Sequence, residues 1–327
     1  MTEFHQSVLL KETLKYLNVR QGKKYIDATV GGAGHAVEIV KCGGEVLGLD
    51  VDSEAIEFAK EMLEARSLKL DDEAGSWKLE KGNFKNIEKI AKENDFYPVA
   101  GVLYDLGLSS HQLEHSGRGF SFKKSEPLDM RADPDLKVTA ADLVNGLSEK
   151  ELTKLFEKYG EESRARAVAG AIIRSRWDKS IKTSAELTDI VEQVVRKPPF
   201  AKASGGKPRK RHPATKVFQA LRIAVNDELN NLKSSLPPAF GLLEPRGRLV
   251  VISFHSLEDR IVKNYFRTGN LDGEVKKDFY GNVESPFVPV NRNVIQAGEE
   301  EISQNPRARS AKLRIAEKRV FDRKESL

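Results

Sequence analysis

Residues 25–52 read YIDATVGGAGHAVEIVKCGGEVLGLDVD, and this stretch decides the fold. An apolar strand ends on Asp27, a glycine-rich turn covers residues 31–35, a short helix follows, and a second apolar strand ends on Asp50. A strand that breaks into glycines lets the next helix present free backbone N–H groups, and a carboxylate closing the neighbouring strand can accept hydrogen bonds from a ribose diol. The stretch therefore predicts the opening of a nucleotide-cofactor site in an α/β fold.

The glycine turn distinguishes between two cofactors. The dinucleotide pattern G-x-G-x-x-G starts at Gly32, but Val37 stands where the third glycine lets the helix pack close to the strand. NAD is therefore disfavoured. Asp27 precedes the turn and can pair with an ammonium group, while Asp50 suits a ribose. Because adenosylmethionine carries both groups, these features favour it as the cofactor.

Composition limits the class of protein. The 327 residues suffice for one large domain or two, and the formal charge of +5 is clustered, which favours a polyanionic partner. Cys42 is the only cysteine, so neither an intramolecular disulfide framework nor a cysteine-based zinc site is expected. No apolar run approaches the ~18 residues that span a bilayer, and the N-terminal MTEFHQ lacks the features of a signal peptide. We expect a cytoplasmic protein with no membrane partner.

The α/β alternation continues after the opening stretch. A helix is predicted after Ser53, a strand over 77–84, and a buried strand that ends at Asp105. A fifth strand, 248–254, comes much later, after a turn over 244–247. It is also preceded by a helix from about Thr215 whose apolar face runs on through Leu229 and Leu232. The sheet is therefore interrupted and then resumed.

The interruption has the pattern of helices. Ser148 with Glu151, and Thr183 with Glu186, have the spacing of capping boxes that open amphipathic helices. We therefore expect an α/β sheet domain in two parts with an all-helical insertion between them. The predicted ranges are 1–110 for the first part, 111–211 for the insertion, and 212–327 for the second part with its basic C-terminal segment.

Clustered cations indicate nucleic acid. The Pro/Gly-rich stretch 197–216 has seven Lys and Arg residues and no acidic residue, which favours contact with phosphates over a solvated linker. A polar stripe on the next helix contains Gln219, Arg222 and Asn226, and residues 305–319 are again basic. The candidate RNA-binding residues are Lys207, Arg209, Lys210, Arg211, Lys216, Arg222, Arg307 and Arg309.

Residues at strand ends form the candidate chemical site. Ligands of open α/β sheets bind outside the carboxyl ends of the strands, where the strand order reverses, and Phe84 and Asp105 are predicted there with the two aspartates above. Phe84 can stack on an adenine, and the small residues after Asp105 leave room for a ligand. His111 and His115 have the spacing of helix-borne metal ligands, but no third ligand is evident, so no metal is expected.

Six longer segments carry a more specific resemblance. They are YIDATVGGAGH from 25, DLGLSSHQL from 105, RGFSFKKSEPLDMRAD from 118, HPATKVFQALRIAVN from 212, SFHSLEDRIVK from 253 and NPRARSAKLR from 305. Together they resemble the successive motifs of the MraW (RsmH) family of bacterial methyltransferases, nearly from end to end. The resemblance implies a Rossmann-like adenosylmethionine-dependent methyltransferase sheet interrupted by an all-helical domain. It also implies methyl transfer to the N4 amino group of a cytidine in the decoding region of 16S ribosomal RNA. The small ribosomal subunit is then the partner, and the oligomeric state, a homodimer included, stays open.

The resemblance also implies roles for individual residues. Asp27 was already indicated by its position before the glycine turn. Together with the residues that the resemblance implies, the cofactor-binding positions are Asp27, Ala33, Gly34, His35, Asp50, Phe84, Asp105 and Gln112. The cytosine amine is a poor nucleophile that the protein must align and polarise, and the catalytic candidates are Asp105, Ser109 and His255. Ala33 replaces a glycine of the family's G-x-G-G-H turn, and its methyl would crowd the ligand if that position has a positive φ.

Two other functions stay open at this point. An NAD-dependent oxidoreductase would need the missing third glycine, and it leaves the basic segments unexplained. A non-catalytic RNA-binding ribosome-assembly factor would explain the basic segments but not the carboxylates at the strand ends. Titration with the two cofactors separates the three functions.

Overall fold

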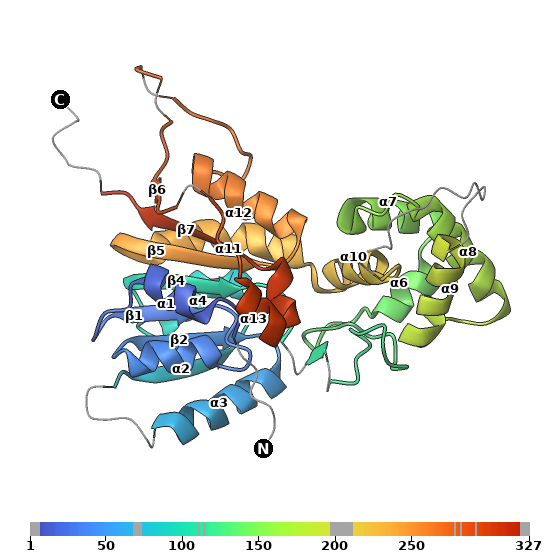
Figure 1. The fold of residues 1–327 in the computed structure, drawn as a ribbon, viewed down its shortest axis with the longest axis horizontal. Helices are drawn as coiled ribbons and strands as arrows, with labels where there is room; N and C mark the ends of the chain where they lie inside the picture. The colour runs from blue at the N-terminus through green and yellow to red at the C-terminus, as the bar shows by residue number, and fades with distance from the viewer. Residues whose placement is uncertain are drawn as a thin grey trace. The chain divides into compact units, whose positions relative to one another are not determined.

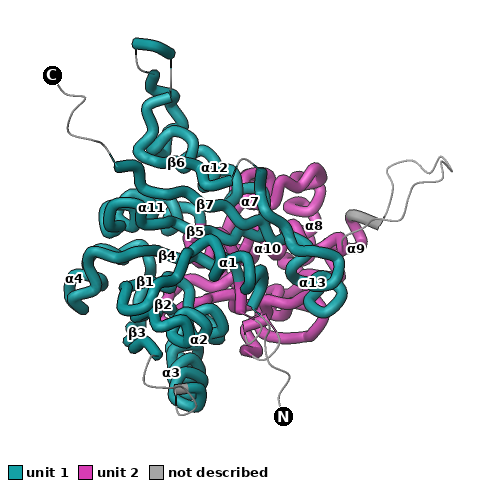
Figure 2. The backbone as a smooth tube through the Cα atoms, turned by 60° about the vertical axis from the view of Figure 1, so that its left-hand side comes forward, with its two compact units in different colours: residues 1–107, 229–327 teal, residues 108–228 magenta. Residues whose placement is uncertain are grey.

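The computed structural model describes residues 7–67, 74–109, 112–113, 116–196, 212–277, 279–281, 283–291 and 293–320. The segment 197–211, with Lys207, Arg209, Lys210 and Arg211, lies outside the described residues, as do His111 and His115. Contacts between Cα atoms divide the chain into two compact units (Figure 2). Unit 1 comprises Met1–Gly107 and Leu229–Leu327, and unit 2 comprises Leu108–Glu228.

Unit 1 is built on a seven-stranded sheet of order β3-β2-β1-β4-β5-β7-β6 (Figure 1). Strands β1 to β5 pair in parallel, whereas β7 is antiparallel to both β5 and β6. The α/β prediction is confirmed, and the two later strands are additions to it. The strands are β1 Lys24–Asp27, β2 Glu45–Asp50, β3 Trp77–Lys81, β4 Val99–Asp105, β5 Leu243–Ser253, β6 Phe287–Pro289 and β7 Lys312–Lys318.

Helices cover both faces of this sheet, and successive strand residues alternate between the two cores. Ile26 belongs to a core shared with α4, α11 and α12, while the preceding Tyr25 belongs to a core shared with α1, α2 and α3. Because both faces are covered, β4 is buried along all but its last residue. The helices are α1 Leu10–Leu17, α2 Gly34–Lys41, α3 Ser53–Ser67, α4 Ile87–Glu93, α11 Glu228–Leu242, α12 Ser256–Thr268 and α13 Glu299–Gln304, with 3₁₀ turns η1 Phe84–Asn86 and η2 Pro306–Ser310.

The strand order reverses between β1 and β4, and this position locates the functional edge of the sheet. From β1 the chain proceeds outward to β2 and β3, and then returns to place β4 on the other side of β1. Crossover loops therefore diverge at the carboxyl ends of β1 and β4, which leaves room for a ligand there. Asp27 is the last residue of β1 and Asp105 is the last residue of β4.

Unit 2 is helical over most of its described length. Its core includes the buried side chains of Leu152, Phe156, Val168 and Leu221. Both predicted capping boxes are present: Ser148 and Glu151 cap α7 reciprocally, and Glu186 accepts from the Thr183 N–H while its own N–H donates to Thr183 Oγ1. The helices are α6 Ala140–Gly146, α7 Glu149–Gly160, α8 Ala165–Asp178, α9 Ser184–Arg196 and α10 Thr215–Asn226.

The single helix predicted from Thr215 through Leu232 is wrong. Asp227 has φ 51°, in the left-handed region, and ends α10 before α11 begins. The apolar spacing continues across this break, so periodicity could not reveal it. Helix α10 packs closely on α7, and the division by contacts accordingly places 212–228 with unit 2.

The turn predicted over 244–247 is also wrong, because these residues lie inside β5. The chain there carries an irregularity instead: Arg246 has φ 64°, and the pairing of β4 with β5 shifts register between Val99 and Gly101. Pro and Gly mark such an irregularity as readily as they mark a turn. Among the described residues, no helix has both the length and the hydropathy that crossing a membrane requires.

Candidate functional site

The glycine turn after β1 holds its residues in a conformation that few side chains tolerate. Gly31 has φ 45° and Ala33 has φ 59°, and Ala33 forms the N-cap of α2. The sequence left open whether position 33 has a positive φ, and in the structure it does. A left-handed alanine costs about 1–2 kcal/mol, which the burial of this turn must offset. At Gly34 a Cβ atom would lie 2.0 Å from Ser7 Oγ, so only glycine fits there without movement.

Asp50 ties the end of β2 to this turn. Its Oδ2 accepts a hydrogen bond from the Gly31 N–H (3.1 Å), and its Oδ1 accepts one from the Asp52 N–H (2.9 Å). Burial raises the pKa of Asp50 to about 6 despite these hydrogen bonds. Each carboxylate oxygen keeps a second lone pair, so Asp50 can still accept from a ribose diol.

Asp27 is an almost completely buried carboxylate at this edge. The residue is only 1% exposed, and Oδ1 accepts a hydrogen bond from the Thr29 N–H at 3.2 Å. Burial raises the pKa of Asp27 to about 7, and the neighbouring charge of Asp50 adds to the shift. A cation bound beside Asp27 would lower its pKa again, because a positive charge stabilises the ionised carboxylate.

Asp105 and His35 face each other across the same edge. Asp105 Oδ1 is buried and accepts no hydrogen bond from any described residue. His35 Nε2 donates to the Val8 carbonyl (3.2 Å), since a carbonyl can only accept, and a neutral ring then turns an acceptor, Nδ1, toward Asp105 Oδ2 at 3.7 Å. Burial, with the charges of Asp27 and Glu258, raises the pKa of Asp105 well above its usual range. Burial therefore favours the protonated form of Asp105, and a cation bound nearby would favour the ionised form.

These carboxylates determine the charge of the ligand that the edge can bind. Asp27, Asp50 and Asp105 close three adjacent strands, β1, β2 and β4, and the pKa of each is raised. Such a site stabilises a cationic ligand and repels the pyrophosphate of a dinucleotide. The electrostatics therefore favour the sulfonium cofactor over NAD, as the glycine spacing does.

Thr29 is a functional residue that the sequence reasoning missed. Its N–H donates to Asp27, and its Oγ1 accepts a hydrogen bond from the Asp105 N–H at 2.7 Å. One side chain thus joins the carboxyl ends of β1 and β4. The signal available in the sequence was a threonine two residues after a strand-end aspartate, a spacing that allows a local turn.

Phe84 lies beside the same strand ends. It begins η1, is partly buried, and packs edge-on against Tyr104, with ring centroids 5.5 Å apart and planes at 80°. Because Tyr104 fixes one side of the ring, Phe84 is pre-oriented. Its stacking on an adenine stays a prediction.

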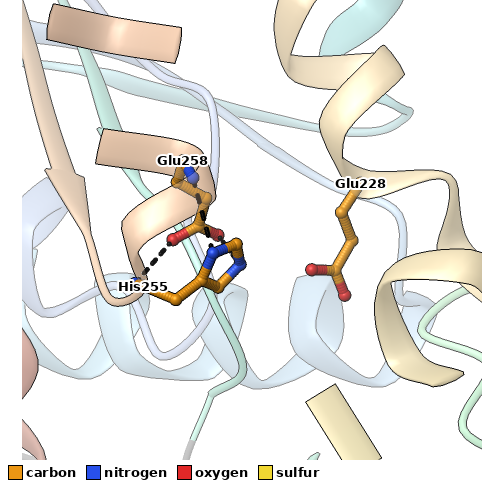
Figure 3. Close-up of side chains that lie close together, drawn as sticks. All are labelled: Glu228, His255 and Glu258. Carbon is orange, nitrogen blue, oxygen red and sulfur yellow. Dashed lines mark hydrogen bonds and ion pairs between the residues drawn. The ribbon is translucent and has the colours of Figure 1, made fainter. Parts of the chain in front are cut away.

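His255 caps a helix instead of projecting freely. It is the N-cap of α12: the Glu258 N–H donates to Nδ1 (3.4 Å), and Glu258 Oε2 accepts from the N–H groups of His255 (3.2 Å) and Phe254 (2.9 Å). Figure 3 shows the ring against the Glu258 carboxylate, with Nε2 3.2 Å from Oε1. These contacts describe a structural histidine, and a catalytic role for it stays a prediction. Glu228, also drawn there, belongs to unit 2, where it pairs with Arg222 at 2.8 Å.

Ser109 and Gln112 belong to unit 2, just beyond the division at Gly107. They bind each other reciprocally: the Ser109 N–H donates to Gln112 Oε1, and the Gln112 N–H donates to Ser109 Oγ, both at 3.1 Å. These two hydrogen bonds join Ser109 to Gln112 shortly after the end of β4. A catalytic role for Ser109 and a cofactor contact for Gln112 stay predictions.

Among the RNA-binding candidates that the structure describes, some side chains already bind other groups of the protein. Lys216 Nζ donates to the Glu161 carbonyl (2.6 Å), and Arg222 pairs with Glu228, so both already stabilise unit 2. Arg307 and Arg309 lie on η2, where Arg309 is exposed and Arg307 is partly buried. Their contact with RNA stays a prediction.

The polar stripe on α10 has a structural use. Gln219 Nε2 donates to the Tyr159 carbonyl (3.0 Å), and Asn226 Nδ2 donates to the Met130 carbonyl (2.8 Å) while its Oδ1 accepts from the Ala132 N–H (2.7 Å). Asn226 thereby holds the irregular segment around Met130, whose φ is 60°. This function was missing from the sequence reasoning, because the partners are distant in the chain.

The open sheet with this strand order, with a glycine turn and a row of buried carboxylates at its reversal point, places the chain among the Rossmann-like methyltransferases. Here the sheet is interrupted by a helical unit. Within that class, the chain belongs to the MraW methylase family, whose family model matches residues 2–319.

Individual relatives are similar over almost their full length. Three proteins named "Ribosomal RNA small subunit methyltransferase H" illustrate this. The one from Halothermothrix orenii is 44% identical over 96% of this chain and 98% of its own. Those from Carboxydothermus hydrogenoformans and Bacteroides thetaiotaomicron are 45% and 43% identical, each over 97% of this chain and 98% of theirs. Family membership, together with the acidic edge, leaves no support for an NAD-dependent oxidoreductase.

Proposed function

We propose that this protein transfers a methyl group from adenosylmethionine to the N4 amino group of a cytidine in the decoding region of 16S ribosomal RNA, in the cytoplasm. Membership of the MraW methylase family and the relatives' names support this substrate class. The observation that carries the proposal is the row of buried carboxylates with raised pKa values, because it selects a cationic cofactor.

Each carboxylate has a role that follows from its surroundings. Asp50 keeps free lone pairs for the ribose diol, and Asp27 provides a negative charge for the ammonium of the methionine moiety. When bound, the cofactor supplies an electrophilic methyl group on a sulfonium.

Asp105 is the candidate for the group that acts on the cytosine amine. A cation bound at the edge favours the ionised form of Asp105, whose Oδ1 accepts no hydrogen bond from the described residues. That oxygen can accept a hydrogen bond from the exocyclic amine and align its lone pair. It can also take the proton that the amine releases when the new N–C bond forms.

The test is transfer of a tritiated methyl group to small ribosomal subunits that lack the modification, followed by identification of the labelled nucleoside. Asp105→Asn should lower kcat by about a hundredfold or more while adenosylmethionine still binds. Asp95→Asn is the matched control, because Asp95 is an exposed turn residue of the same unit with φ 55°. Near-normal turnover of folded Asp105→Asn would move the catalytic role to another residue.

The rival function predicts a different result in the same assay. A non-catalytic assembly factor would bind the subunits without transferring label at any adenosylmethionine concentration. A homodimer stays a prediction that sedimentation can check.

A further inference from the structure

A closed loop of unit 1 projects from the sheet between α12 and β6 (Figures 1 and 2). We call residues 271–284 the acidic arm. Its base is tight, because a Cβ atom on Gly269 would lie 2.2 Å from Pro286 Cδ. Within it, Lys277 and Val283 form an antiparallel bridge, and the Glu284 N–H donates to the Lys276 carbonyl at 2.9 Å. The described residues on the two sides of the arm are therefore joined by their own backbone.

The acidic arm concentrates exposed apolar side chains. Phe279 is 98% exposed and Tyr280 is 86% exposed, with their ring centroids 5.7 Å apart. Three further apolar side chains of the arm are exposed: Leu271, Val275 and Val283. Among the residues that the structure describes, the other exposed aromatics, Phe58, Tyr97 and Trp177, lie far apart in the sequence. Several exposed apolar side chains within one short segment indicate an interaction site, and aromatic rings commonly anchor such interfaces.

The charge of the arm determines the kind of partner. Residues 271–284 contain four acidic and two basic side chains, in a chain whose formal charge is +5. An arm with net negative charge repels phosphates, so RNA is disfavoured as its direct ligand. Negative charge around an apolar tip instead complements a cationic protein surface with an apolar pocket.

The arm leaves the sheet at the edge opposite the carboxylate row. Helix α12 begins after the carboxyl end of β5 and has 13 residues, so it carries the chain about 20 Å back along the sheet. Phe287, just after the arm, pairs with Lys318, and the adjacent Glu317 pairs with Arg248 in the first half of β5. The arm therefore does not contribute to the cofactor edge, and its partner need not be the target base.

We propose that the acidic arm docks on a cationic protein surface of the particle that contains the substrate RNA. The inference rests on the proposed function, since proteins that coat ribosomal RNA carry the positive charge that the arm requires. Phe279 and Tyr280 insert into an apolar pocket of that surface, and the acidic side chains around them provide long-range attraction.

The experiment compares binding to two forms of the same RNA. The affinities of the wild type and of Phe279→Ser/Tyr280→Ser are measured for small subunits lacking the modification and for protein-free 16S ribosomal RNA. The double variant should bind the subunits at least about tenfold more weakly and the free RNA unchanged. Phe58→Ser, which removes an exposed aromatic from α3 of the same unit, should leave both affinities unchanged. A second variant, Asp272→Asn/Glu274→Gln, should flatten the salt dependence of subunit binding.

Three outcomes would overturn the proposal. Equal losses on subunits and free RNA would mean that the arm contacts RNA. Unchanged affinity for both would mean that its aromatics dock on nothing in the particle. Loss of a wild-type dimer in sedimentation, with unchanged subunit affinity, would assign the arm to a second copy of the chain. Binding does not require methyl transfer, so a wild type that binds subunits without transferring label would contradict the proposed function and leave this comparison intact.

Discussion

Replacing Asp27 by Asn is expected to weaken cofactor binding. It is also expected to make the fold more stable than that of the wild type, by a difference in unfolding free energy that grows as the pH rises. Burial raises the pKa of Asp27 in the folded chain to about 7, from the usual value of 3.8 that an unfolded chain retains. Between these values the folded state keeps its proton while the unfolded state ionises. Stability therefore falls as the pH rises toward about 7 and is constant above it, because there both states are ionised.

The size of the effect follows from the shift. Each unit of pH within this window removes about 1.4 kcal/mol of unfolding free energy, so Asp27 by itself accounts for a loss of about 3 kcal/mol between about pH 5 and pH 8. Asn cannot ionise, yet its side-chain oxygen can still accept from the Thr29 N–H. The stability of Asp27→Asn should therefore gain about 3 kcal/mol relative to the wild type over that range.

Native-state hydrogen exchange of amides in β1 and β4 is the suitable measurement, because a chain with two units need not unfold in one step. Asp95→Asn, an exposed replacement with the same change of charge, should show no such trend. Calorimetry should show that wild-type affinity for adenosylmethionine rises with pH through about 7, whereas Asp27→Asn binds about ten- to a hundredfold more weakly and with a smaller pH dependence, which Asp50 and Asp105 retain. A stability difference that is constant from pH 5 to pH 8 would refute the reasoning.

Two further predictions test the turn and unit 2. Gly34→Ala should lower adenosylmethionine affinity by about tenfold or more, because its Cβ would lie 2.0 Å from Ser7 Oγ. Adding Ser7→Ala should recover part of the loss by calorimetry, and no recovery would mean that the clash is not the cause. Asn226→Ala leaves the Ala132 N–H and the Met130 carbonyl without their partner, so hydrogen-exchange stability of unit 2 should fall by about 1–3 kcal/mol. Equal loss in unit 1 amides would contradict a local role for Asn226.

Local patterns in the sequence were sufficient for the features whose partners are close in the chain. The capping boxes at Ser148 and Thr183 join residues three positions apart, and the glycine turn follows directly from the end of β1. The replacement of a glycine by Ala33 was also visible in the sequence, whereas the positive φ at this position came from the structure. These features depend on spacing and backbone sterics, which the order of residues states directly.

Interactions between segments that are distant in the chain could not be predicted from local sequence patterns. Thr29 joins Asp105 across 76 positions, and Asn226 binds Ala132 across 94. Asp227 breaks a helix whose apolar spacing continues unchanged, because the two sides pack on different units. Arg222 was predicted to bind RNA because it is cationic, but in the structure it forms an ion pair with Glu228.

By itself, then, the sequence determined the strand-end carboxylates, the turn between them and the class of fold, since each is a local pattern with a steric or hydrogen-bonding cause. Only the tertiary structure decided which carboxylates are buried together, and therefore which of them have raised pKa values. The raised pKa values of Asp27 and Asp105 arise from burial and from neighbouring charges brought together by the sheet. Desolvation depends on everything packed around a group, and no short segment of the chain specifies that environment.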